Sequence, residues 1–190
     1  MTNSVTRLDL SFLSSSNDPT AKSIVSECIR NDFLLCEEMG KYSEQLVLLD
    51  GNPSRLLSPQ ILWGGSQSLA SAQFNFDWPR TPVSPRSVFS ETYRQIVAGG
   101  YCDCINQTSV IIEHIECDDT VLVGRLPVSY VRALIPITNG QGAWFIGVYS
   151  FKPSPGRYPK ASSKAEQFRQ ACIPGSTNLH MPCSPAVFPR

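Results

Sequence analysis

The sequence predicts an α+β fold built on a single antiparallel sheet with its helices on one face. Helical and strand patterns do not alternate along the chain, which argues against a doubly wound parallel sheet. Two predicted strands come before a helical section, and four strand patterns, the last three of them longer, come after it. At 190 residues, the chain has room for one domain with flanking segments.

The first predicted element is a helix from Pro19 to Met39. Asn17 or Asp18 can cap it, Pro19 suits its first turn, and Gly40 suits its end. Its apolar residues form one broad stripe, made of Ile24, Val25, Cys28, Ile29, Leu35 and Cys36. We expect this stripe to pack either on the rest of the domain or on the same helix of a second copy.

Two strands and a helical section are predicted next. Residues 45–49 and 59–65 have strand patterns, and the sequence Asp50-Gly51-Asn52-Pro53 between them is typical of a turn. Residues 66–80 combine small residues with aromatic ones, and we expect short helical turns and loops there.

A longer helix is predicted after this section. Ser84 can cap it, Pro85 suits its first position, and the pair Gly99 and Gly100 is expected to end it. One face of this helix would carry Phe89, Tyr93, Ile96 and Val97.

The remainder up to Phe151 is rich in strand patterns. They are YCDCI, TSVIIEHIEC, LPVSYVRALIPI and GAWFIGVYSF. Residues 139–142, with the sequence Asn-Gly-Gln-Gly, are expected to join the last two strands as a hairpin loop. The partial alternation of apolar and polar residues in TSVIIEHIEC predicts that Glu113 faces solvent.

Charge divides the chain into a body and a tail. Residues 1–151 contain ten Lys and Arg against fifteen Asp and Glu, whereas residues 152–190 contain six against one. The net charges are therefore −5 and +5, and an acidic body argues against a broad nucleic-acid surface. The tail is either a solvated segment, a contact for an anionic partner, or a segment that folds back on the body.

Three regions follow from these patterns. They are an N-terminal helix with its extension (residues 1–42), a central domain (residues 43–151) and a basic tail (residues 152–190) that holds seven of the fifteen prolines. The chain has no run of about 18 apolar residues that would predict a membrane span. Its start lacks the apolar stretch of a secretory signal, so we expect a cytoplasmic protein. Its seven cysteines, an odd number, are then expected to be mostly reduced thiols.

One short stretch, GGYCDCINQTSVIIEHIECDD, brings Cys102, Cys104, His114 and Cys117 close together in sequence. In a strand, Cys102 and Cys104 would share one face, whereas Cys117 would point away from the face of His114. Zinc thiolates usually come as Cys-x-x-Cys pairs, and the spacing here is Cys-x-Cys. The pattern therefore favours structural strand residues over a metal site. A redox sensor would need a lowered thiol pKa.

Catalytic signatures are weak in this sequence. Only His114 and His180 could act as a histidine base, and the serine-nucleophile motif GxSxG is absent. The phosphate-binding motifs GxGxxG and GxxxxGK[ST] are also absent. Arg132 is more informative because it lies within an apolar strand. It must reach solvent, pair with a carboxylate or meet an anionic ligand, and pairing is the favoured alternative.

The order of elements resembles that of the PAS fold, in particular a diverse and often stand-alone bacterial PAS-like group. The stretches that carry the resemblance are ILWGGSQSLASAQFNFDWPR, FSETYRQIVAGGY and VSYVRALIPITNGQGAWFIGVYSF, and the likeness spans roughly residues 43–151. In that group, a tyrosine and an arginine precede an apolar strand that contains proline, as Tyr130 and Arg132 do here. The resemblance implies a sensory or protein-interaction module, with dimers formed through the N-terminal helix.

The resemblance also implies an apolar pocket that can hold a small ligand. Its candidate ligand-binding residues are Trp63, Phe76, Trp78, Tyr93, Tyr130, Arg132 and Trp144, with Tyr130 or Arg132 as the polar anchor. The middle section lacks the cysteine that flavin-binding members carry, and His114 lies in a predicted strand, unlike the histidine of haem-binding members. The cofactor is therefore left open.

A PAS-like module of this kind would signal in trans, because nothing after Phe151 resembles a kinase, a cyclase or a DNA-binding effector. Its partner would be a signalling protein. Two alternatives remain: a small α+β enzyme that acts on a hydrophobic substrate through a pocket carboxylate or cysteine, and a Cys/His metal or redox sensor.

Overall fold

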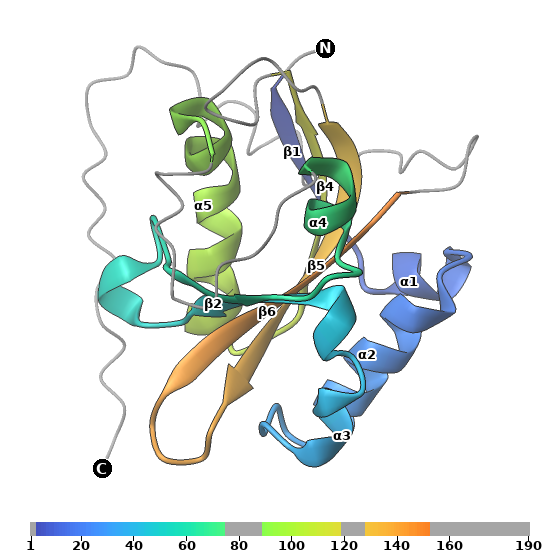
Figure 1. Ribbon diagram of the computed structural model, residues 1–190, viewed down its shortest axis with the longest axis vertical. Coiled ribbons are helices and arrows are strands. Elements are labelled where there is room, and N and C mark those ends of the chain that lie inside the picture. Colours follow the sequence, from blue (N-terminus) through green and yellow to red (C-terminus); the bar gives the residue numbers. More distant parts are fainter. Residues whose placement is uncertain (1–2, 75–88, 119–127, 153–190) are drawn as a thin grey trace.

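The centre of the computed structural model is one six-stranded antiparallel sheet (Figure 1). The structure describes residues 3–74, 89–118 and 128–152. The strands lie side by side in the order β1-β4-β5-β6-β2-β3. Their bounds are β1 (Ser4–Leu8), β2 (Leu46–Asp50), β3 (Ile61–Gly64), β4 (Ile111–Cys117), β5 (Val128–Thr138) and β6 (Trp144–Phe151). The predicted α+β class and the single antiparallel sheet are therefore confirmed.

Helices cover both faces of this sheet, so the prediction that they gather on one face is wrong. The described helices are α1 (Ser11–Ser15), α2 (Pro19–Arg30), α3 (Glu37–Gly40), α4 (Leu69–Phe74) and α5 (Glu91–Asn106), with short 3-10 turns η1 (Ser43–Gln45) and η2 (Pro53–Arg55). Figure 1 shows α1, α2 and α3 on one side of the sheet and α5 on the other.

Strand β5 shows why both faces need cover. Val131, Ala133 and Ile135 pack in the same cluster as residues of α1 and α2. Tyr130 and Leu134 pack with residues of α5 instead. Since successive strand residues point to opposite faces, β5 buries apolar side chains on both.

Helix α2 begins where the sequence predicts and ends earlier. The Asp18 carboxylate caps it by accepting a hydrogen bond from the Ala21 backbone N–H at 2.9 Å. The helix stops at Arg30 rather than Met39 because the backbone turns into the left-handed region at Asp32 (φ 49°) and Phe33 (φ 59°). Its buried side chains, Ala21, Ile24, Val25 and Cys28, pack on the sheet of the same chain.

Strand β1 was not predicted. It pairs with β4 at the edge of the sheet, and Thr6 lies opposite His114. Five residues without a strong apolar alternation give a weak strand signal, and the partner strand lies more than 100 residues away in sequence. The N-terminal segment therefore contributes both a strand and the helices that cover one face.

Two strand predictions before the helical section agree with β2 and β3, but YCDCI is not a strand. It forms the last part of α5, which runs through Gly99 and Gly100 to Asn106. The predicted helix end at this glycine pair is therefore wrong. The described part of α5 begins at Glu91, where Ser90 Oγ accepts a hydrogen bond from the Tyr93 N–H at 3.1 Å.

The predicted hairpin loop at residues 139–142 is confirmed between β5 and β6. The Asn139 side-chain oxygen accepts hydrogen bonds from the backbone N–H groups of Gln141 and Ala143. Gly140 has φ +73° and Gly142 has φ +95°, and L-residues rarely adopt these values.

We expect Gly142→Ala to lower the free energy of unfolding by about 1–2 kcal/mol. A Cβ at this position would contact nothing within 4 Å, so the loss would come from backbone strain alone. Chemical denaturation monitored by circular dichroism measures it. Gly40→Ala is the matched control, because its Cβ also meets nothing within 4 Å and its φ is not positive. Equal unfolding free energies for the two variants would contradict the strain argument.

Several sequence predictions concern residues outside the described ranges. They are the helix cap at Ser84 and Pro85, the aromatic residues Phe76 and Trp78, His180, and the basic tail from residue 153 onward. Within the described ranges, no helix has the length and apolar character needed to cross a membrane.

Candidate functional site

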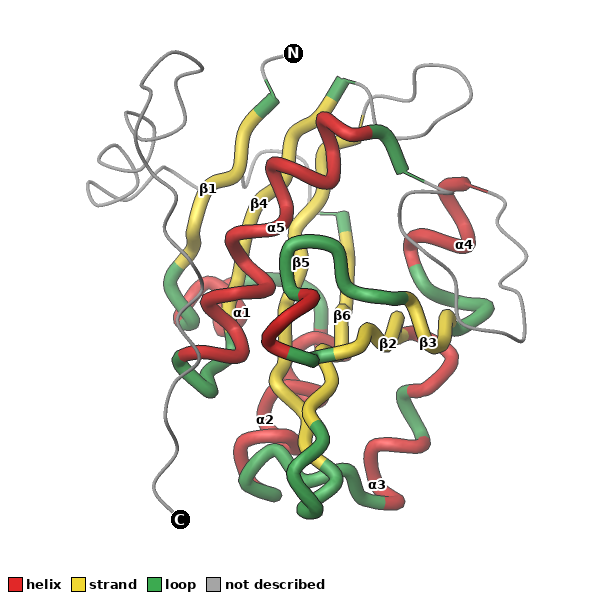
Figure 2. Tube along the Cα trace, turned by 90° about the vertical axis from the view of Figure 1, so that its left-hand side faces the viewer, coloured by secondary structure: helices red, strands yellow, loops and turns green. Residues whose placement is uncertain are grey.

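A small pocket lies between α5 and the sheet. Figure 2 shows α5 lying along β4 and β5. Leu69 and Ala70 of α4, a helix that contacts β6, also line the pocket. The pocket has a cavity volume of about 70 Å³. Its walls are mostly apolar, with residues such as Val47, Leu49, Ile61, Leu69, Val97 and Val148. An apolar hollow of this kind with a few polar groups is typical of small-molecule sites.

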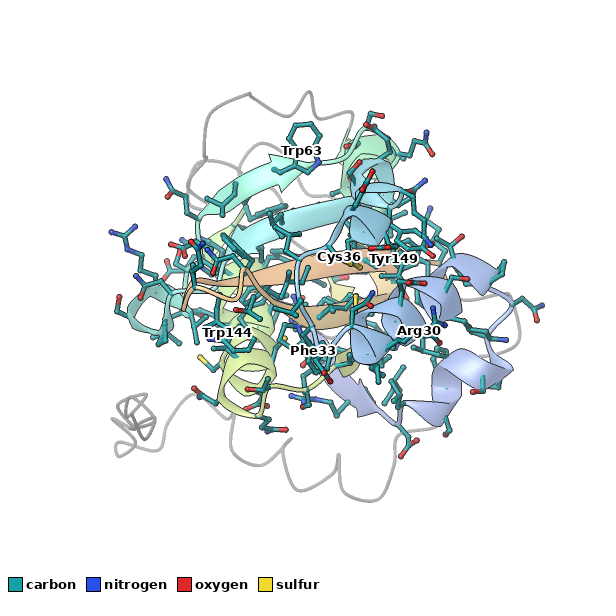
Figure 3. All side chains as sticks on the ribbon, turned by 90° about the horizontal axis from the view of Figure 1, so that it is seen from below. Arg30, Phe33, Cys36, Trp63, Trp144 and Tyr149 are labelled. Carbon is teal, nitrogen blue, oxygen red and sulfur yellow. The ribbon has the colours of Figure 1, made fainter. Side chains whose placement is uncertain are left out.

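Three of the seven predicted ligand-binding residues line this pocket, namely Tyr93, Tyr130 and Arg132. Trp63 and Trp144 do not. Trp63 is 49% exposed on the edge strand β3, and its Nε1 donates a hydrogen bond to the Ser43 carbonyl. Figure 3 shows Trp63 and Trp144 far apart. Phe76 and Trp78 fall outside the described residues.

Tyr93 and Tyr130 form the first polar feature of the pocket. The hydroxyl group of Tyr93 on α5 and that of Tyr130 on β5 make a hydrogen bond to each other. Burial raises the pKa of Tyr93 well above its usual value and raises the pKa of Tyr130 to about 12. Both phenols therefore stay protonated at neutral pH and can donate hydrogen bonds.

Arg132 forms the second polar feature, and its predicted pairing with a carboxylate is confirmed. It is 1% exposed, and its Nε and Nη2 donate to Glu113 Oε2 at 2.9 and 2.6 Å. Nη2 also donates to the Val97 carbonyl of α5 at 2.8 Å. The guanidinium lies over the ring of Tyr101, 4.7 Å from its centroid. Arg132 thus links the sheet to α5.

Glu113 is buried, so the prediction that it faces solvent is wrong. It is 1% exposed, and the strand register places it between Arg7 of β1 and Arg132 of β5. Arg7 Nη2 lies 3.4 Å from Glu113 Oε1 and 2.5 Å from Asp103 Oδ2. Two cations and two carboxylates therefore form a row from the pocket wall to the surface. A signal for this row was present in the sequence, because Glu113 has the same parity as the buried Ile111 and Ile115.

Gly100 allows α5 to approach this ion pair. A Cβ added at Gly100 would come within 2.5–2.8 Å of the Glu113 carboxyl group, whereas one added at Gly99 would meet nothing within 4 Å. Of the two glycines that the sequence places at a helix end, only Gly100 has to be glycine for α5 to pack against Glu113.

The stretch from Cys102 to Cys117 does not form a converging cluster. Cys102 and Cys104 lie on α5, whereas His114 and Cys117 lie on β4 at positions of opposite parity. Among the residues that the structure describes, no three His, Cys, Asp or Glu side chains are arranged to hold a metal ion. Burial raises the pKa of the Cys104 thiol well above its usual range and that of Cys28 to about 12. These two thiols are therefore poor nucleophiles.

His114 lies on the face of the sheet opposite the pocket, and its Nε2 is 3.1 Å from Ser129 Oγ. Burial lowers its pKa, although Glu116 opposes the shift. The folded state therefore favours neutral His114, whereas the unfolded chain takes up a proton near the usual pKa of about 6.5. The resulting stability is complete above that value and is lost as the pH falls toward the folded pKa.

We expect wild type to lose more stability than His114→Gln when the pH is lowered from about 7.5 to about 5.5. Urea unfolding of both proteins at each pH measures this difference. Both proteins contain His180, so it does not contribute to the difference between their unfolding free energies. A difference in unfolding free energy that stays constant with pH would contradict the burial of neutral His114.

Comparison of the chain with protein-family models, with curated proteins and with solved structures found no match. The function of the chain therefore has to be inferred from its own residues.

Proposed function

We propose that this protein is a PAS-like sensory module that binds a small molecule between α5 and the sheet and passes a signal to a partner protein. The observation that carries the proposal is the apolar pocket with a buried polar wall of Tyr93, Tyr130 and Arg132. The element order supports it, because β2 and β3, the helical section, α5 and the meander β4-β5-β6 follow one another as the resemblance implies.

Tyr93, Tyr130 and Arg132 are well placed to respond to a ligand in the pocket. Arg132 contacts α5 through the Val97 carbonyl and contacts the sheet through Glu113. A ligand that changes the position of Arg132 or of the tyrosine pair would shift α5 relative to β4 and β5. Such a shift is a change that a partner can recognise by its different contacts with the two arrangements.

Contact with a second copy is the other part of the proposal. The inner half of the predicted stripe is buried in its own domain, which leaves Ile29 and Leu35 of the stripe exposed, together with the neighbouring Leu34. Ile29, Leu34 and Leu35 are 47%, 46% and 53% exposed. We place the dimer contact on these three residues, at the end of α2 and the segment that follows it.

Native mass spectrometry of the full purified chain, beside a denatured sample, tests both parts. We expect a dimer that carries an organic adduct, with the adduct lost on denaturation, and a monomer for the double variant Ile29→Glu, Leu35→Glu. A bare dimer would retain the interaction role and contradict the ligand. A bare monomer that binds no small molecule would contradict the proposal as a whole.

A further inference from the structure

The polar wall of the pocket, formed by Tyr93, Tyr130 and Arg132, has hydrogen-bond donors that meet no acceptor among the described residues. Tyr93 and Tyr130 share one hydrogen bond, so one of the two hydroxyl protons is used and the other is left over. Neither hydroxyl has a further acceptor among the described residues. An unused donor in a buried wall is costly unless a ligand or water accepts its hydrogen bond.

Arg132 has the same surplus. A guanidinium carries five N–H groups, and the hydrogen bonds of Arg132 to Glu113 and Val97 come from Nε and Nη2. Within the described part of the chain, Nη1 donates to nothing. Arg132 and both tyrosines line the same cavity.

Charge at the pocket favours a negative group. Glu113 balances Arg132, and Asp103 balances Arg7. Arg94 of α5 also lines the pocket, and its Nε donates only to the Phe89 carbonyl, at 3.4 Å. No carboxylate among the described residues lies within ion-pair distance of Arg94. Among the described residues, the pocket therefore has an excess of one positive charge.

We propose that the ligand of this pocket is a short apolar monocarboxylate. Its carboxylate accepts hydrogen bonds from the tyrosine pair and from Arg132 Nη1, and Arg94 supplies the compensating charge. Its hydrocarbon part lies against Val47, Leu49 and Val148, and the cavity of about 70 Å³ limits this part to a few carbon atoms. This inference rests on the proposed function, since it names the class of ligand for the same pocket.

Three probes of similar size and different head groups test the assignment on the full chain: pentanoate, 2-pentanone and pentylamine. Ligand-observed NMR titrations give their affinities. We expect pentanoate to bind most tightly and pentylamine most weakly, because the wall donates hydrogen bonds and carries positive charge. Equal or tighter binding of 2-pentanone or pentylamine would overturn the carboxylate assignment.

Two variants test which residues hold the carboxylate. Tyr130→Phe keeps the ring and removes one hydroxyl group, and we expect it to weaken pentanoate binding about 3- to 10-fold. Arg94→Gln should weaken pentanoate but leave 2-pentanone unchanged. Tyr93→Phe replaces Tyr130→Phe if circular dichroism shows that the latter does not fold. Unchanged pentanoate affinity in both variants would overturn the assignment.

Failure of this inference is distinguishable from failure of the proposed function. An adduct in native mass spectrometry that lacks a carboxylate would overturn the carboxylate assignment and leave the ligand-binding role intact. The absence of any adduct, together with no binding of the three probes, would overturn both.

Discussion

Arg132→Met is expected to lower the free energy of unfolding by about 3–5 kcal/mol. The substitution removes the partner that makes two hydrogen bonds to Glu113 and leaves that carboxylate buried. Arg7 compensates poorly, because its Nη2 lies 3.4 Å from Glu113 and already pairs with Asp103. Urea denaturation at neutral pH, followed by circular dichroism, measures the loss.

The matched control removes both charges. In the double variant Arg132→Met, Glu113→Leu, no buried charge is left without its partner, so we expect most of the lost stability to return. The unfolding free energies of wild type, Arg132→Met, Glu113→Leu and the double variant then form a double-mutant cycle. Two results would contradict this account: a loss below about 1 kcal/mol in Arg132→Met, or a double variant that is less stable than Arg132→Met.

Gly100→Ala is expected to lower the free energy of unfolding by about 2–4 kcal/mol. The added Cβ would come within 2.5–2.8 Å of the Glu113 carboxyl group. This group is the end of a flexible side chain, but its hydrogen bonds to Arg132 prevent it from moving aside without breaking the pair. Helix α5 would therefore have to shift away from the sheet. Thermal and urea unfolding measure the effect.

Gly99→Ala provides the comparison for Gly100→Ala. It lies in the same helix one residue earlier, is exposed, and its Cβ would meet nothing within 4 Å. Alanine is favoured over glycine inside a helix, so this variant should gain about 0.5–1 kcal/mol. If both variants changed stability in the same direction and by the same amount, the close approach of α5 to Glu113 would be excluded.

Part of the candidate site was predictable from the sequence. An arginine within an apolar strand needs a partner, and that requirement correctly predicted a paired Arg132. The sequence does not predict the partner, because the incomplete alternation of apolar and polar residues in this strand favours the solvent face for Glu113. The run ALIPI in β5 also indicated burial on both faces, and this signal would have predicted helices on both sides of the sheet.

The stretch that begins at Gly99 and contains Cys102, Cys104 and Cys117 differs from its prediction for another reason. The sequence pattern predicts a helix end at Gly99 and Gly100, since glycine is common at helix ends. The helix continues to Asn106, and its residues Cys104 and Ile105 beyond the glycine pair are buried against the sheet. The absence of a Cβ at Gly100 lets this part of α5 lie close to Glu113. Because α5 extends to Asn106, the segment YCDCI is helical and not a strand. Cys102 and Cys104 therefore do not share a strand face.

The sequence by itself determined the features whose causes are local: the Asp18 cap of α2, the loop at Gly140 and Gly142, and the meander that ends in β6. Only the tertiary structure decided the pairing of β1 with β4, the burial of Glu113 and the path of α5 past Gly100. Caps and turns depend on the conformational preferences of adjacent residues. The row from Arg7 to Arg132 depends instead on the register between strands that are distant in sequence, and no local pattern specifies that register.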